Sequence, residues 1–177
     1  GKVEHAIFYE YNTGQKVDGL NKLIEDYDKL NKNAFETYDL VKNALTTKDT
    51  TGHSKIDWVL RYGGYNPNDG DKIHSEFSVY NDALKIDGEG VGGTIDILIE
   101  HKDGSFSIID LKTGSLSDER KGKLKYGNMD ESVLNKSMLQ VMLYAMLLKS
   151  NNKDIKFRNL KLLKLSNTNE VVPFDIA

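Results

Sequence analysis

Two apolar runs joined by a short polar turn constrain the fold of this chain more than any other feature. Residues 94–100 and 106–112 are rich in β-branched and apolar side chains, a composition typical of β-strands. The turn between them carries Asp103-Gly104, a dipeptide typical of hairpin tips. The two runs are therefore predicted to pair as an antiparallel hairpin with one acidic residue inside each strand, Asp96 and Asp110.

The length of the turn decides where these two acids point. A two-residue loop at Asp103-Gly104 would set Asp96 opposite Leu111, and the acids would face opposite sides of the sheet. A three-residue loop over 102–104, with Gly104 in the left-handed conformation, sets Asp96 directly opposite Asp110. The Cβ atoms of directly opposed residues lie about 4.5–5.5 Å apart.

We favour the three-residue loop because it produces a coherent apolar surface on the other face of the hairpin. That register pairs Ile95 with Leu111 and Ile97 with Ile109. Lys112 then lies on the same face as the acids, because side chains alternate along a strand. The pair Leu98–Ile108 on that face needs cover from a helix, so the sheet is predicted to be buried on both faces.

Two carboxylates and a lysine brought to one place indicate hydrolysis of a phosphodiester with a divalent metal. Mg²⁺ and Mn²⁺ take oxygen ligands, and magnesium is often held by one or two carboxylates and substrate phosphates. Lys112 would orient or deprotonate the attacking water, or stabilise the developing negative charge. The alternative for Asp96, Asp110 and Lys112 is a set of solvated salt bridges at strand ends, since short motifs occur by chance.

Three motifs together resemble the PD-(D/E)XK nuclease superfamily, and most closely its RecB-like branch. They are Gly93-Thr-Ile-Asp96, Asp110-Leu-Lys112-Thr-Gly114 and Gln140-Val-Met-Leu-Tyr144, in the order in which that branch carries G-x-x-D, D-x-K-T-G and Q-x-x-x-Y. Gly1-Lys-Val-Glu-His5 also matches an upstream G-x-x-x-H.

The resemblance implies a Mg²⁺- or Mn²⁺-dependent deoxyribonuclease, expected to be an exonuclease in DNA repair, recombination or phage DNA processing. It implies metal ligation by His5, Asp96, Asp110 and the carbonyl of Leu111, with Lys112 serving the attacking water. The alternative for His5 is an ordinary surface or core histidine.

The resemblance also implies supporting residues on two other elements. Glu76, in the predicted strand 73–80, would lie near the active site, although an exposed edge strand explains it equally well. Gln140 and Tyr144 lie four residues apart, on one face of a predicted helix. They would contact DNA or support the catalytic lysine, and the alternative is a place on the helix surface or core edge.

Periodicity outlines the rest of the fold. Apolar residues at helical spacing predict one long helix or two shorter ones over 17–45 and a helix over about 130–149. Residues 56–62 fit a short helix or a strand. Strands are expected at 73–80, 83–87 and 159–165, with a turn near 81–82 and a glycine-rich hairpin turn at 88–93. The predicted fold is α/β, a restriction-endonuclease-like core with a mixed central β-sheet flanked by α-helices, in the order αβββαβ.

Composition is consistent with one globular domain over 1–177, divided into a helical part (6–72) and a catalytic core (73–165). The chain has no cysteine, so disulfides and thiolate metal sites are excluded. No apolar run approaches the roughly 18 residues needed to span a membrane, and we expect a place in the cytoplasm of a bacterial or phage-infected cell. A chain that starts on Gly1 leaves open that it is a domain of a larger protein or complex.

The charge of the chain counts mildly against nucleic-acid binding, because its formal net value is −3. A basic run over 120–125 includes Lys121 and Lys123, which would grip a phosphate backbone or else form a solvated loop. Two other functions stay open. One is a non-catalytic nucleic-acid-binding or assembly module on the same fold, and the other is an RNA endonuclease of the cap-snatching type.

Overall fold

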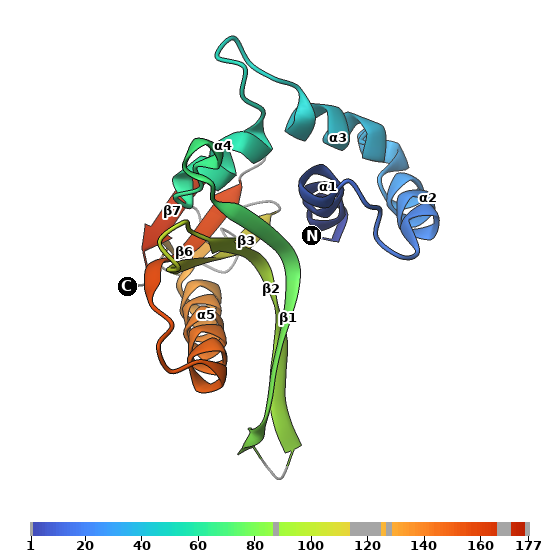
Figure 1. Ribbon diagram of the computed structural model, residues 1–177. Coiled ribbons are helices and arrows are strands. Elements are labelled where there is room, and N and C mark those ends of the chain that lie inside the picture. Colours follow the sequence, from blue (N-terminus) through green and yellow to red (C-terminus); the bar gives the residue numbers. More distant parts are fainter. Residues whose placement is uncertain (1, 87–88, 114–124, 127–128, 166–170, 176–177) are drawn as a thin grey trace.

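A computed structural model describes residues 2–86, 89–113, 125–126, 129–165 and 171–175 (Figure 1). Four helices come first, and a sheet interrupted by one long helix follows. The helices are α1 (Lys2–Thr13), α2 (Leu20–Leu30), α3 (Tyr38–Thr46), α4 (Lys55–Tyr62) and α5 (Glu131–Asn151), with short 3-10 turns η1 (Lys32–Ala34) and η2 (Pro67–Asp69). The strands are β1 (Lys72–Ile86), β2 (Glu89–Glu100), β3 (Phe106–Thr113), β4 (Lys125–Tyr126), β5 (Met129–Asp130), β6 (Phe157–Leu165) and β7 (Val171–Asp175).

The main sheet is mixed and has the strand order β1-β2-β3-β6-β7. Only β3 and β6 pair in parallel among its neighbours, because α5 carries the chain back across the sheet between them. The mixed α/β architecture with flanking helices is thus confirmed, with β7 as an additional edge strand. Pro173 fits this place, because an edge strand can lack one N–H donor.

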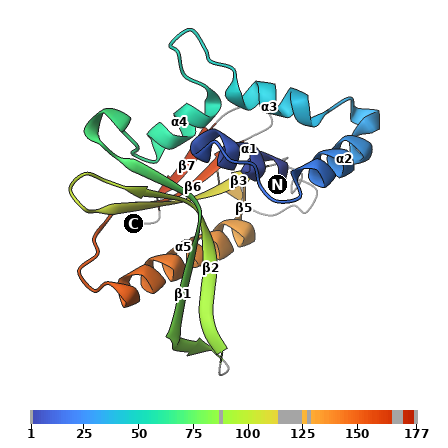
Figure 2. The same cartoon turned by 45° about the vertical axis from the view of Figure 1, so that its right-hand side comes forward.

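Helices cover both faces of the sheet, as the hairpin pattern predicted (Figure 2). On one face α1 and α4 pack against Ile97, Ile109 and Leu111, all almost completely buried. On the other face α5 covers Leu98 and Ile108. These apolar contacts on both sides hold the middle of the sheet rigid around the strand ends that carry the acids.

The hairpin between β2 and β3 has the predicted three-residue loop. Ile97 pairs with Ile109 and Leu98 with Ile108. The amide of His101 donates to the carbonyl of Ser105 at 2.8 Å and closes the loop. Gly104 has a φ of +85°, the left-handed conformation that this loop requires. The two-residue alternative is excluded, and with it the register that would separate the acids.

The hairpin between β1 and β2 corrects the sequence-based boundaries. We expected a turn near 81–82 and another over 88–93, but β1 continues to Ile86 and β2 begins at Glu89. Gly92 and Gly93 are paired with Tyr80 and Val79 inside the ladder, since glycine weakens a strand without preventing backbone pairing. The ladder shifts its register between Asn81 and Lys85. The long hairpin extends beyond the end of α5 (Figures 1 and 2).

The N-terminal helices decide two points that the sequence left open. Residues 17–45 form two helices, α2 and α3, rather than one, and residues 56–62 belong to the helix α4. Ser54 caps the start of α4 with a reciprocal capping box. The Ser54 hydroxyl accepts from the Asp57 amide, and the Asp57 carboxylate accepts from the Ser54 amide. Helix α1 itself was not predicted.

Candidate active site

Asp96 lies where β2 and β3 separate. The described ladder between these strands ends at the pair Ile97–Ile109, one step before Asp96. From there the Asp96 Oδ2 accepts a hydrogen bond from the backbone amide of Leu111 at 2.9 Å. A side-chain carboxylate thus takes the position of a strand partner, and it is fixed between the two strands.

Asp110 faces Asp96 across this opening, and its side chain is only 6% exposed. Burial, the negative charge of Asp96 and a hydrogen bond donated to Asp96 raise the pKa of Asp110 to about 7. Burial also works to raise the pKa of Asp96. Hydrogen bonds from His5, Asp110 and the Leu111 amide outweigh burial there and hold the Asp96 pKa below its usual value. The two carboxyl groups therefore share one proton near neutral pH.

Lys112 follows on the same strand and reaches back to this pair. Its Nζ lies 3.2 Å from the Oδ2 of Asp110, and its side chain is 33% exposed. The Asp110 Oδ2 is nonetheless a buried acceptor without a well-directed hydrogen bond. The lysine therefore supplies charge from the solvent side, while one carboxylate oxygen stays available to a further positive partner.

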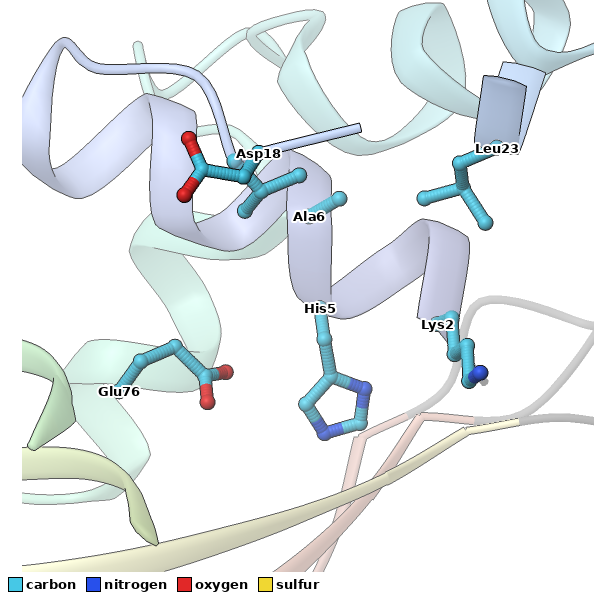
Figure 3. A pocket seen from close by; sticks show the side chains of 7 residues that line it. Lys2, His5, Ala6, Asp18, Leu23 and Glu76 are labelled. Carbon is cyan, nitrogen blue, oxygen red and sulfur yellow. The ribbon is translucent and has the colours of Figure 1, made fainter. Parts of the chain in front are cut away.

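His5 and Glu76 approach the same opening from α1 and β1. The Nε2 of His5 lies 3.3 Å from the Asp96 Oδ2. Glu76 has a φ of +52°, which is uncommon for a residue other than glycine. Its neighbours Ser75 and Phe77 pair with Ile97 and Ile95 on either side of Asp96. The unusual backbone turns the Glu76 carboxylate toward His5 (Figure 3), and burial with the charge of Asp96 raises its pKa.

A cavity of about 620 Å³ adjoins this cluster (Figure 3). His5 and Glu76 line it together with Lys2 and Asp18, which we did not single out from the sequence. Lys2 belongs to α1, where it occupies a variable position of the G-x-x-x-H match, and Asp18 belongs to the loop before α2, outside any motif. Only the packing of α1 beside β1 brings them together, so no sequence signal could have found them.

Helix α5 brings Gln140 and Tyr144 to the strands that carry the two acids. The Gln140 amide donates to the Tyr144 hydroxyl at 2.8 Å, and that hydroxyl also accepts from the Thr94 amide. Burial and the nearby charges of Asp110 and Asp96 raise the pKa of Tyr144, which places the phenol close to the acid pair. A helix-surface position is thus excluded for Tyr144, which is 6% exposed.

Gly93 explains how Tyr144 comes so close to β2. A Cβ atom on residue 93 would lie 2.5 Å from the Cε1 of Tyr144, so only glycine leaves room for the ring. The glycine of the G-x-x-D motif and the tyrosine of the Q-x-x-x-Y motif are therefore in direct contact, three residues from Asp96. This contact gives a physical reason why the two motifs, which lie far apart in the sequence, occur together.

We expect Gly93→Ala to destabilise the fold by about 1–3 kcal/mol, because the added methyl group would force the buried ring or the strand to move. Urea unfolding measures this change. In a Tyr144→Ala background the same substitution should cost much less, since the ring that it meets is gone. An equal cost in both backgrounds would show that the Gly93–Tyr144 contact does not explain the glycine.

Two predicted residues, Lys121 and Lys123, lie outside the described residues. Within the described parts of the chain, no three His, Asp or Glu side chains are already arranged to hold a metal ion. No helix among the described residues is long and apolar enough to cross a membrane.

Comparison with known proteins agrees with this geometry. The model of the PD-(D/E)XK nuclease superfamily matches residues 1–170, and the chain belongs to this superfamily. Membership indicates a nuclease, which is a hydrolase that acts on nucleic acid. No curated protein matches. The crystal structure of SSO0001 aligns with 99% of this chain and 75% of its own, at 13% identity and a TM-score of 0.43.

Proposed function

We propose that this protein is a Mg²⁺- or Mn²⁺-dependent deoxyribonuclease of the RecB-like type. The observation that carries the proposal is the buried pair Asp96–Asp110 with Lys112 3.2 Å away. Structural salt bridges do not require two carboxyl groups to be buried face to face, since one of them must then stay protonated at a cost. A site that exchanges this proton for a metal ion explains the arrangement.

The residues present fit a divalent metal by their chemistry. The Asp110 Oδ2 is a buried acceptor that no well-directed hydrogen bond satisfies. Asp96 and Asp110 supply the oxygen donors that Mg²⁺ and Mn²⁺ prefer, and His5 adds a nitrogen donor beside Asp96. The carbonyl of Leu111 would be a fourth donor, because it faces the same strand edge as the amide that reaches Asp96.

The residues of the chain divide the work of hydrolysis. A bound divalent ion supplies Lewis-acid polarisation of the phosphoryl group and lowers the pKa of water. Lys112 orients the attacking water and stabilises negative charge that develops next to Asp110. Gln140 and Tyr144 keep β2 close to α5 and thereby position Asp96. Glu76 and His5 line the path by which substrate reaches the acids.

DNA is the proposed substrate, and exonucleolytic removal of nucleotides is the proposed mode, in repair, recombination or phage DNA processing. The complete set of G-x-x-D, D-x-K and Q-x-x-x-Y motifs in one site supports the RecB-like assignment over an RNA endonuclease. Lys121 and Lys123 would add contacts to the phosphate backbone.

A panel of labelled substrates tests the proposal. Linear and circular DNA, single- and double-stranded, and RNA of the same sequence are each incubated with Mg²⁺ or Mn²⁺. The proposal expects degradation of linear DNA from its ends with circular DNA and RNA intact. Cleavage of circular DNA would refute the exonuclease mode, and faster cleavage of RNA would refute the choice of DNA.

Metal binding is expected to release a proton and to strengthen as the pH rises through about 7. The Asp110 pKa is raised to about 7, so below that pH the proton competes with the metal, and above it the carboxylate is free. Calorimetric titration of Mn²⁺ in two buffers of different ionisation enthalpy measures the released protons. We expect release at pH 6 and almost none at pH 8.5. If Mn²⁺ binding releases the same number of protons at both pH values, the two carboxyl groups do not share a proton.

A further inference from the structure

A second cavity, of about 520 Å³, lies away from the acid pair. It is formed within residues 48–68 by the loop before α4, one face of α4 and the turn that leads to β1. Gly64 at its edge lies against Asn159, near the start of β6 and opposite Ser107 of β3. Asp110 and Lys112 lie further along β3, and neither lines this cavity.

The cavity combines positive charge with amide and aromatic groups. Its lining includes Lys48, His53, Arg61, Tyr65, Asn66 and Asn68. The guanidinium of Arg61 lies 5.5 Å from the centre of the Trp58 ring, and its Nη1 lies 2.7 Å from the Nε2 of His53. Because arginine can only donate, the Nε2 of His53 is an acceptor, and His53 does not neutralise the charge.

Carboxylates near the cavity are already committed to other donors. Asp57 accepts from the Tyr11 hydroxyl with Oδ1 and from the Ser54 amide with Oδ2. Asp49 accepts from the Trp58 indole at 2.8 Å and from two backbone amides of its own loop. Asp57 itself lines the cavity and interacts electrostatically with Lys48 without a direct ion pair. Among the described residues no carboxylate forms an ion pair with Arg61, so the two cations of the lining outnumber its one carboxylate.

Both walls of the cavity are held in place before any ligand binds. The loop 49–53 is closed by two backbone hydrogen bonds, from the Asp49 amide to the His53 carbonyl and from the Gly52 amide to the Asp49 carbonyl. The opposite wall is fixed by Asn66, whose amide donates to the buried Asp71 at 3.0 Å. The Asp71 carboxylate is also hydrogen-bonded to His101, and His101 is hydrogen-bonded to the Ser107 hydroxyl at 2.6 Å in the core. A rigid, cationic site loses little entropy on binding, which favours affinity.

We infer that this cavity binds a phosphate group, with Arg61 and Lys48 as the charged donors and the side-chain amide of Asn68 as a neutral one. Arginine binds phosphate through paired hydrogen bonds, and the volume suits a nucleoside phosphate. The phosphate comes either from a DNA strand that extends beyond the catalytic site or from a free nucleotide. The inference stands on the cavity alone and holds whether or not the proposed nuclease chemistry is correct.

Trp58 is the only tryptophan of the chain and lies against Arg61, so its fluorescence reports on the cavity directly. The protein is titrated without metal with deoxyadenosine monophosphate and, separately, with deoxyadenosine. We expect a saturable change in Trp58 emission with the monophosphate alone, weakened by added salt. An equal response to deoxyadenosine, or no response to either, would overturn the inference.

Variants locate the binding. The affinity of Arg61→Ala for deoxyadenosine monophosphate is measured by calorimetry, because this substitution alters the surroundings of Trp58. We expect that affinity to be about tenfold weaker. Lys48→Ala, at an exposed position, should weaken binding severalfold without disturbing the fold. Lys153→Ala, an exposed lysine beyond α5, is the matched loss of one charge and should bind as the unaltered protein does. Unchanged affinity in both cavity variants would overturn the inference.

A short single-stranded oligonucleotide distinguishes the two sources of phosphate. Tighter binding of the oligonucleotide than of the monophosphate, lost in Arg61→Ala, would assign the cavity to the DNA strand. Binding of the monophosphate alone would assign it to a free nucleotide. Oligonucleotide binding that is insensitive to Arg61→Ala, together with no monophosphate binding, would contradict both.

Discussion

Replacement of Asp110 by asparagine is expected to reduce DNA cleavage at least about a thousandfold, because the substitution removes an anionic oxygen donor from the centre of the proposed site. The overall fold should survive, since asparagine has nearly the same shape and can donate a hydrogen bond to Asp96. Cleavage of end-labelled DNA at saturating Mn²⁺ measures the activity, and circular dichroism checks the fold.

The same substitution is expected to stabilise the metal-free protein at alkaline pH. The folded-state pKa of Asp110 is raised to about 7 from an ordinary 3.8. Between these values the folded state binds more protons than the unfolded state, so stability falls as the pH rises, and the loss is complete above about 7. Asp110→Asn removes this loss and should gain about 1 kcal/mol or more at pH 8.

Urea unfolding in EDTA at pH 5 and pH 8 measures this difference. Glu76, whose pKa is also raised, contributes to the pH dependence of both proteins, so the difference between them isolates Asp110. Asp96 has a lowered pKa and therefore acts only at more acidic pH. If the free energy of unfolding falls equally from pH 5 to pH 8 in both proteins, Asp110 is not buried against a second negative charge.

Lys112→Ala is expected to lower cleavage by about 10²–10⁴-fold while metal binding persists. The lysine touches Asp110 but is not among the proposed metal ligands, and general acid–base and electrostatic contributions each have this size. The turnover number should fall much more than the affinity for DNA. Single-turnover cleavage and calorimetric Mn²⁺ titration of the same preparation separate the two effects.

Lys161→Ala provides the control for the loss of a lysine from the same sheet. Lys161 belongs to β6, where it pairs with Ile109 of β3. Its Nζ donates to the Tyr62 carbonyl at 3.0 Å, on the side of α4. Its substitution should leave cleavage nearly unchanged. Similar losses of activity in Lys112→Ala and Lys161→Ala would mean that the effect is one of general charge or stability, and that Lys112 has no special role.

The hairpin that carries the acids could be predicted from the sequence because its signals are local. The apolar pairs and the Asp103-Gly104 tip specified the register that the structure confirms at Ile97–Ile109. The expected pair Ile95–Leu111 was wrong, because the described ladder ends at Ile97 and Ile95 packs on the α5 face. The β1–β2 hairpin was misjudged for the opposite reason. Its glycines looked like a turn, but they pair within a ladder whose length depends on both strands at once. Helix α1 carried no periodicity that we used.

The candidate site could be predicted only in part for a similar reason. Asp110 and Lys112 are related by alternation along one strand, and Asp96 is related to them by the register of one hairpin, so all three can be read from a local stretch of sequence. The approach of His5 to Asp96 and the unusual backbone at Glu76 depend on how α1 packs beside β1. The cavity around Arg61 belongs to no motif, because its lining residues come together only through the fold of residues 48–68.

The central claim is that the acid pair and Lys112 form a metal-dependent DNA nuclease. The most direct measurement is the time course of nucleotide release from end-labelled linear DNA by the unaltered protein and by Asp110→Asn. Each is assayed with Mg²⁺ or Mn²⁺ and with EDTA. We expect release only by the unaltered protein and only with metal. Release in EDTA, equal release by the variant, or no release by a protein that binds both metal and DNA would contradict the claim.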